Sequence, residues 1–258
     1  MTFQHLNFNV TDHVARVRLR RPPVNALNRE LVGELTELAR QLRDLAEAWV
    51  VELAAEGKIF CAGADLKERA GIPDAGVADV VRGIQTMASS WMEVPQPVVV
   101  GIQGPALGGG LELALAGDIL IASDEAVLGF PEVSLGIIPA AGGTQRLAQR
   151  ASLGAANKWV LSARQFTARE ALDDGVVDLV VPAAKFSESL ATYVGLIVSN
   201  APLALRQAKS AINSAYKERL QRGLTRELEA YAPLIATNDR REALEAFAQK
   251  RKPVWKGT

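Results

Sequence analysis

The chain has a single cysteine and only two histidines among its 258 residues. The lone Cys61 excludes an internal disulfide and is typical of a reducing compartment. His5 and His13 lie far in sequence from every glycine-rich segment. We therefore expect neither a histidine-based catalytic triad nor a histidine-rich metal site, and no bound metal. Acid and base chemistry would then depend on carboxylates.

Net charge and long apolar runs are also lacking. Lysine plus arginine number 29, as do aspartate plus glutamate, so no long-range field favours nucleic acid or an anionic membrane. Charges interrupt every apolar stretch before the roughly twenty residues that a membrane span needs. The N-terminal segment does not resemble a secretory signal. We expect a globular cytoplasmic protein, whose 48% hydrophobic residues supply a buried core.

Hydrophobic periodicity predicts alternating strands and helices up to about residue 182. Residues 14–20 alternate apolar side chains with arginine and predict the second strand of a hairpin. Asn28 is placed to cap a helix, and residues 49–55 predict the strand that follows it. Further strands are expected at 97–102, 118–123, 126–130 and 176–181, and further helices after the caps Asp65, Thr144 and Thr167.

The remainder of the chain, from about residue 183, has an almost entirely helical pattern. Pro202 suits the first turn of one helix, and Asp239 with Glu242 suits the start of the last. The sequence thus predicts an α/β body followed by a helical tail.

Two glycine-rich turns, GPALGGGLE at 104–112 and FCAGAD at 60–65, precede predicted helices. Neither has the lysine and hydroxyl residue of a P-loop or the glycine spacing of a dinucleotide site. Glycine lets backbone amides approach a ligand, and a helix that begins there adds unpaired N–H groups that can stabilise an oxyanion. Alternatively, both are tight turns in which glycine serves only packing.

Two glutamates are isolated charges in apolar surroundings. Glu112 follows the three glycines within an apolar helix, and Glu132 is the only charged residue from 126 to 145. Burial raises a carboxylate's proton affinity, and two neighbouring carboxylates raise it further, which suits a general acid and base near neutral pH. The alternative is that one or both face solvent. Asp118 and Cys61, by contrast, are expected to be structural.

Three motifs in the same order resemble the enoyl-CoA hydratase/isomerase (crotonase) superfamily: FCAGADLKE at 60–68, GPALGGGLELALAGD at 104–118 and FPEVSLGIIPAAGGTQRL at 130–147. The resemblance extends from RPPVNALN at 21–28 nearly to the C-terminus. It implies an α/β spiral of repeated ββα units over residues 1–195, which holds the active site. It further implies a C-terminal helical region, 196–258, that assembles trimers or hexamers.

The resemblance also implies an enzyme that adds water to an enoyl-CoA, without a cofactor beyond the coenzyme A of the substrate. Glu112 would activate the water for attack at Cβ, and Glu132 would supply a proton at Cα. The amides of Ala62 and Gly109 would form the oxyanion hole. The implied contacts to substrate and coenzyme A are Ala62, Gly63, Ala64, Asp65, Leu66, Gly109, Phe247 and Lys250.

Several functions remain open within this resemblance. A short-chain enoyl-CoA hydratase of fatty-acid β-oxidation ranks first. The stretches LKERAGI and KRKPVWKG are similar to the methylglutaconyl-CoA hydratase branch of leucine breakdown, which ranks second, and an enoyl-CoA isomerase ranks third. An RNA-binding protein that retains the fold is the least favoured, and would use the basic stretch at 204–222.

Overall fold

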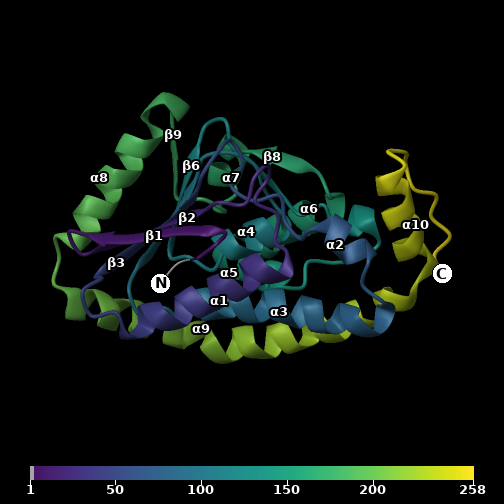
Figure 1. Ribbon diagram of the computed structural model, residues 1–258, viewed down its shortest axis with the longest axis horizontal. Helices are drawn as coiled ribbons and strands as arrows, with labels where there is room; N and C mark the ends of the chain where they lie inside the picture. Colours follow the sequence, from purple (N-terminus) through teal and green to yellow (C-terminus); the bar gives the residue numbers. More distant parts are fainter. Residues whose placement is uncertain (1–2) are drawn as a thin grey trace.

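The computed structural model describes residues 3–258, which form two sheets packed among helices (Figure 1). The larger sheet has the strand order β1-β2-β3-β4-β6-β9, in which β1 is antiparallel to β2 and every other pair is parallel. The smaller sheet has the order β5-β7-β8. The strands are β1 Leu6–Thr11, β2 Val14–Leu19, β3 Val50–Ala55, β4 Val98–Ile102, β5 Ala106–Leu107, β6 Ile119–Ser123, β7 Val127–Gly129, β8 Gln165–Thr167 and β9 Leu179–Val181.

Helices cover both faces of the larger sheet and form the C-terminal part of the chain. The α-helices are α1 Arg29–Asp44, α2 Leu66–Ala70, α3 Asp74–Met92, α4 Gly109–Ala114, α5 Gly143–Arg150, α6 Leu153–Ser162, α7 Ala168–Asp173, α8 Phe186–Val198, α9 Pro202–Tyr231 and α10 Asn238–Ala248. Short 3-10 helices are η1 Glu132–Leu135, η2 Ala183–Lys185 and η3 Ala232–Ala236.

The core divides at the larger sheet. One face packs on α1, α3 and α4 in the main apolar cluster, and the other face packs on α8 through Phe186, Leu190 and Val194. Helix α9 runs beneath α1 and α3 along the length of the molecule, and α10 lies at one end beyond α2 (Figure 1). Residue 195, the predicted boundary, lies within α8, and the division into two regions stays a prediction.

Most local predictions are confirmed. The hairpin forms, the side chain of Asn28 accepts from the Leu31 N–H, and Thr167 makes a complete capping box with Glu170. The half-buried carboxylate of Asp118 has a structural role, because it accepts from the Val98 N–H and pairs with Lys209 on α9.

Two of these local predictions are wrong, and β5 and β8 were not predicted. Gly142, rather than Thr144, is the N-cap residue of α5, because the Thr144 hydroxyl is engaged by a glutamate of α9. The strand expected at 176–181 comprises only its last three residues. Asp239 lies in the first turn of α10 as expected, and Thr237 is the N-cap residue of that helix. No helix within residues 3–258 combines the length and apolarity needed to cross a membrane.

Candidate active site

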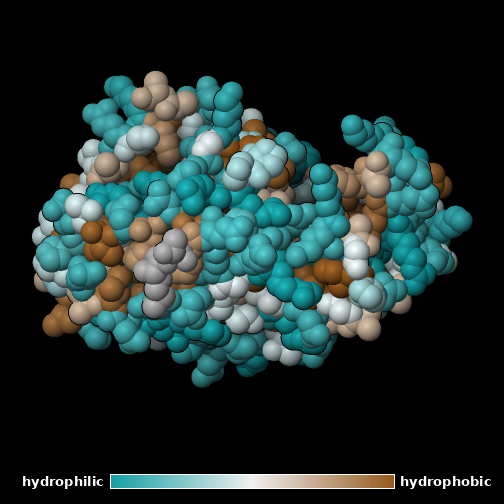
Figure 2. Space-filling view, viewed as in Figure 1, coloured by the Kyte–Doolittle hydropathy of each residue, from teal (hydrophilic) through white to brown (hydrophobic). Residues whose placement is uncertain are grey.

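A cavity of about 690 Å³ lies where the two glycine turns meet η1, the segment 137–141 and the C-terminal helices. The space-filling view shows the surface hollowed between the body and the C-terminal end of the chain (Figure 2). Nine predicted site residues border the cavity: Ala62, Gly63, Ala64, Asp65, Leu66, Gly109, Glu112, Glu132 and Phe247. Lys250, the tenth, follows α10, is exposed and is not among the bordering residues.

Glu112 is 3% exposed and enters the cavity wall from the first turn of α4. Its Oε1 accepts hydrogen bonds from the amides of Ala141 and Gly143, both at 2.7 Å. Burial raises the pKa of Glu112 well above its usual value, and the charges of Glu227 and Glu132 raise it further, while the two amides oppose the shift. The amides therefore favour the charged carboxylate in a setting that otherwise favours the acid.

Glu132 follows Pro131 at the start of η1 and is 9% exposed. Within the described part of the chain its buried Oε2 has no hydrogen-bond partner. Burial raises the pKa of this carboxyl to about 8, and the charge of Glu227 also raises it. Both observations favour a protonated Glu132 at neutral pH.

The first glycine of the triplet fixes where Glu132 can lie. Gly108 has φ +51°, and a methyl group on it would lie 2.5 Å from Oε1 of Glu132. A residue with a Cβ would thus be strained and would also displace the carboxylate. Gly110 serves packing instead, since a methyl group there would lie 2.4 Å from the carbonyl oxygen of Cys61.

The amide of Ala62, predicted to be an oxyanion-hole donor, is engaged within the fold, because it donates to the carbonyl oxygen of Val24 at 3.0 Å. In the same turn the amide of Ala64 has no acceptor among residues 3–258, and the same holds for Gly109 at the start of α4. A methyl group on Gly109 would lie 3.8 Å from the Ala64 nitrogen, so the two free amides are neighbours. The donor pair available to a ligand is Ala64 and Gly109.

A third buried carboxylate, Glu227 of α9, was not predicted. It is 3% exposed and accepts from the Gly142 amide at 2.6 Å and the Thr144 amide at 3.1 Å, and it also bonds the Thr144 hydroxyl. Burial raises the pKa of Glu227. The hydrogen bonds from Thr144 and Gly142 and the positive charge of Arg146 lower it and so oppose this increase. Glu227 lies in a polar stretch of the helical tail, where nothing in the local pattern distinguishes it.

The remaining predicted residues have mixed roles. Asp65 caps α2 and pairs with Arg21 at 2.8 Å, so its carboxylate is engaged by the fold. Glu68, three residues after Asp65, accepts from the Arg29 amide at 3.1 Å. Phe247 is 56% exposed and reaches the cavity from α10.

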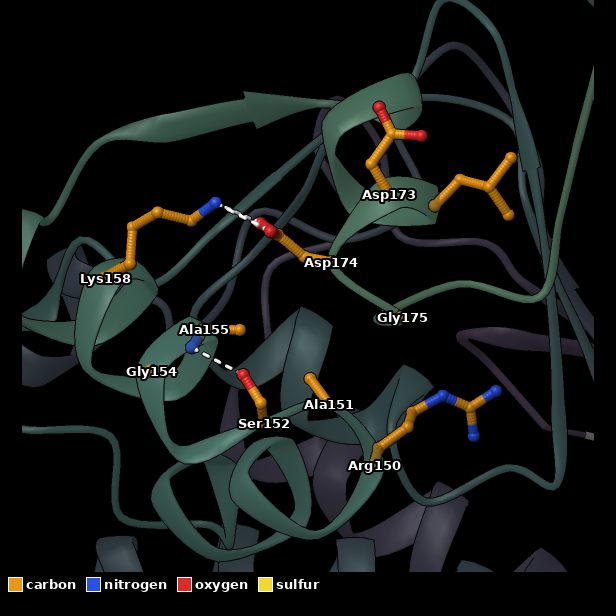
Figure 3. A pocket seen from close by; sticks show the side chains of 10 residues that line it. Arg150, Ala151, Ser152, Gly154, Ala155, Lys158, Asp173, Asp174 and Gly175 are labelled. Atoms are coloured by element: carbon orange, nitrogen blue, oxygen red, sulfur yellow. Dashed lines mark hydrogen bonds and ion pairs between the residues drawn. The ribbon is translucent and has the colours of Figure 1, made fainter.

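A separate cavity of about 550 Å³ lies between α6 and α7 (Figure 3). Its polar side chains are paired within the fold: Lys158 with Asp174, Arg150 with Asp178, and the Ser152 hydroxyl with the Ala155 amide. Asp173, the other acid that lines it, pairs with Arg169 at 3.1 Å. None of the predicted site residues borders this cavity, whereas nine border the larger one, which is therefore the candidate active site.

The chain is similar to known proteins over nearly its whole length. The sequence profile described as enoyl-CoA hydratase/isomerase matches residues 9–258. The chain is 43% identical over 248 residues to YngF of Bacillus subtilis (strain 168), named for the same family, with 95% of each chain covered. It is 36% identical over 249 residues to the 2,3-dehydroadipyl-CoA hydratase of Escherichia coli (strain K12), again with 95% of each covered.

A crystal structure of enoyl-CoA hydratase from Bacillus anthracis superimposes with a TM-score of 0.81 at 41% identity, covering 99% of this chain and 100% of that one. A second enoyl-CoA hydratase structure, from Mycobacterium avium subsp. paratuberculosis, gives a TM-score of 0.90 at 26% identity. The fold class predicted from the resemblance is confirmed.

Proposed function

Because the chain belongs to the enoyl-CoA hydratase/isomerase family, we propose that it adds water across the α,β double bond of an enoyl-CoA to give a 3-hydroxyacyl-CoA. The observation that carries the proposal is that two buried carboxylates, Glu112 and Glu132, border one cavity beside two free amides. Such a cavity offers an acid, a base and an oxyanion site together.

The thioester oxygen is held by the amides of Ala64 and Gly109. Negative charge builds on this oxygen as the enolate forms, and preorganised N–H donors stabilise it without reorganisation. The loss of one such donor costs about 3–4 kcal/mol of transition-state stabilisation. Gly109 also starts α4, so the positive end of the helix faces the same oxygen.

Water addition is divided between the two glutamates. Glu112, whose Oε1 is held by two amides, is the group better suited to remain charged and to activate water for attack at Cβ. Glu132, whose Oε2 has no such donor among the described residues, keeps a proton and delivers it to Cα. Since neighbouring carboxylates share protons as a pair, one charge and one proton on the two groups is the functional state.

Coenzyme A is proposed to bind along residues 62–66, with Phe247 beside it, and to be the only cofactor-like group, as part of the substrate. We also propose that Lys250 contacts coenzyme A when the substrate is bound.

A homotrimer or hexamer in the cytoplasm is part of the same proposal. Large apolar side chains that are 62–73% exposed in the single chain support assembly: Leu153, Leu161, Leu196, Leu203 and Ile212. Light scattering coupled to size-exclusion chromatography would give the mass directly, and a monomeric mass would exclude assembly.

The decisive experiment for the function follows product formation from crotonyl-CoA by mass spectrometry. A hydratase gains one water to give 3-hydroxybutyryl-CoA, whereas an isomerase leaves the mass unchanged and converts 3-enoyl-CoA substrates instead. Absence of both reactions contradicts the proposal. RNA binding is a weaker alternative, since Lys209 of the basic stretch is 8% exposed and paired with Asp118.

A further inference from the structure

A buried arginine without a carboxylate partner lies in the wall of the same cavity. Arg69, on α2, is 7% exposed and borders the cavity. Its guanidinium donates to the hydroxyl of Tyr231 and lies 5.8 Å from the centre of that ring. Within residues 3–258 it forms no salt bridge.

The acidic side chains near Arg69 in the chain are engaged elsewhere. Asp65 pairs with Arg21, and Glu68 accepts from the Arg29 amide. Asp74 pairs with Arg240 at 3.0 Å and with Arg241 at 3.2 Å. The fold thus supplies a carboxylate to the buried Arg240 and none to Arg69.

A desolvated cation without a counter-charge is unfavourable. Burial lowers the pKa of Arg69, Tyr231 opposes this, and the charge of Arg240 lowers it further. An anion that entered the cavity would offset this cost and would bind in a water-poor setting, where charge-assisted hydrogen bonds are strong.

The surroundings define which anion fits. Val81, Ile137, Ile138 and Ala140 border the same cavity and suit an acyl chain. Tyr231, which the Arg69 guanidinium contacts, also borders this cavity, together with Glu112 and Glu132. One acyl chain lying in the cavity can therefore extend from the two carboxylates to the Arg69 guanidinium.

We propose that Arg69, oriented by Tyr231, binds a carboxylate at the far end of the acyl chain, and that the preferred substrate is a short enoyl-CoA of a dicarboxylic acid. This assignment depends on the proposed hydratase function and specifies its substrate class.

The first test compares two five-carbon substrates of the wild-type protein, glutaconyl-CoA and pent-2-enoyl-CoA, which differ in a terminal carboxylate against a methyl group. We expect kcat/KM to favour glutaconyl-CoA by at least about tenfold, because a charge-assisted pair replaces an unpaired buried cation. Equal values, or a preference for pent-2-enoyl-CoA, would overturn the assignment.

Arg69→Met tests the residue itself. We expect kcat/KM for glutaconyl-CoA to fall by about 30-fold or more, while the value for pent-2-enoyl-CoA changes by less than about threefold. Arg82→Met is the matched control, because Arg82 is an exposed arginine of α3 paired with Asp79, and it should leave the ratio unchanged. An equal loss on both substrates would instead indicate that Arg69 contacts coenzyme A phosphates or supports the fold.

Tyr231→Phe removes only the hydroxyl group that contacts Arg69. This variant can be used to test the preference for glutaconyl-CoA if Arg69→Met does not fold. It should reduce the preference for glutaconyl-CoA, and an unchanged preference would exclude Tyr231 as a positioning residue.

Direct binding of two saturated thioesters, measured by isothermal titration calorimetry, separates binding from catalysis. Glutaryl-CoA should bind more tightly than pentanoyl-CoA to the wild type, and this difference should vanish in Arg69→Met. If neither enoyl-CoA is hydrated but glutaryl-CoA still binds more tightly, the hydratase proposal fails and the carboxylate site stands. If both are hydrated without preference, the carboxylate site fails and the hydratase proposal stands.

Discussion

Glu112 and Glu227 divide between them the four consecutive N–H groups of residues 141–144. Glu112 reaches this turn from α4, next to the glycine loop, and Glu227 reaches it from α9 in the helical tail. The turn that holds the proposed base is thus itself held by a second buried carboxylate. Helix α9 therefore contributes to the geometry of the candidate active site.

Glu227→Gln should disturb this turn, because one acceptor oxygen becomes an NH₂ group facing an N–H donor. We expect kcat for enoyl-CoA hydration to fall by about 10-fold to 100-fold with little change in KM, as a misplaced proposed base would cause. Loss of the Glu227 charge should also lower the pKa of Glu112, which burial raises first and Glu227 second.

The acidic limb of the pH profile should therefore move to lower pH in Glu227→Gln. Arg146, Thr144 and the other two glutamates face this group and remain in place. Glu227→Asp keeps the charge and should leave the limb nearer its original position. If Glu227→Gln lowers kcat but leaves the pH profile in place, Glu227 supports the structure of the turn and does not affect the pKa of Glu112.

Stability should depend on pH through Glu132. Its pKa is raised from the usual 4.5 to about 8, mainly by burial, so the folded state binds this proton more tightly than the unfolded state. The resulting contribution is complete below about pH 4.5 and is lost as the pH rises to about 8. Glu132→Gln cannot ionise and escapes this loss.

Urea unfolding near pH 5 and near pH 9 measures the effect. We expect the variant to exceed the wild type in free energy of unfolding by about 1–4 kcal/mol at the higher pH, and the difference to be small at the lower one. The same difference at both values would contradict a raised pKa.

Gly108→Ala should impair activity more than stability. The left-handed φ of +51° strains any residue with a Cβ, and the added methyl group would displace the Glu132 carboxylate. We expect a loss of about 1 kcal/mol or more in unfolding free energy and a fall in kcat of at least about 10-fold. Gly33→Ala, in α1, is the control, because a methyl group on Gly33 would have no other atom within 4 Å. The activity of this variant should equal that of the wild type.

Cys61 should not react with thiol reagents in the native protein. Burial raises its pKa to about 12, and the side chain is fully enclosed. Only the thiolate is nucleophilic, so iodoacetamide should label the chain after unfolding and not before. Rapid labelling of the folded protein would show that the glycine turns open, since Gly110 packs directly on this residue.

Much of the site could be predicted from the sequence because its signals are local. A charged residue in an apolar stretch indicates burial, which is how Glu112 and Glu132 are recognised, and Asn28 and Thr167 show their caps by residue type and spacing. The resemblance predicts an oxyanion-hole donor in the turn at 60–65, and the free amide of Ala64, the donor that we propose, lies in this turn.

What could not be predicted depends on contacts between distant segments. The amides of Ala62 and Ala64 differ because the carbonyl oxygen of Val24 accepts a hydrogen bond from Ala62 and not from Ala64. Thr144 has the residue type of a cap, but Glu227 engages its hydroxyl from 83 positions away. Arg69 stands out only once the carboxylates around it are seen to be paired with other groups.

The most direct measurement is the rate of crotonyl-CoA hydration by Glu112→Gln and Glu132→Gln, each with circular dichroism to confirm folding. The two-carboxylate account predicts that either change lowers kcat by about 10²-fold to 10⁴-fold, since each glutamate performs a separate proton transfer. A folded variant of either kind that turned over at a rate near that of the wild type would contradict it.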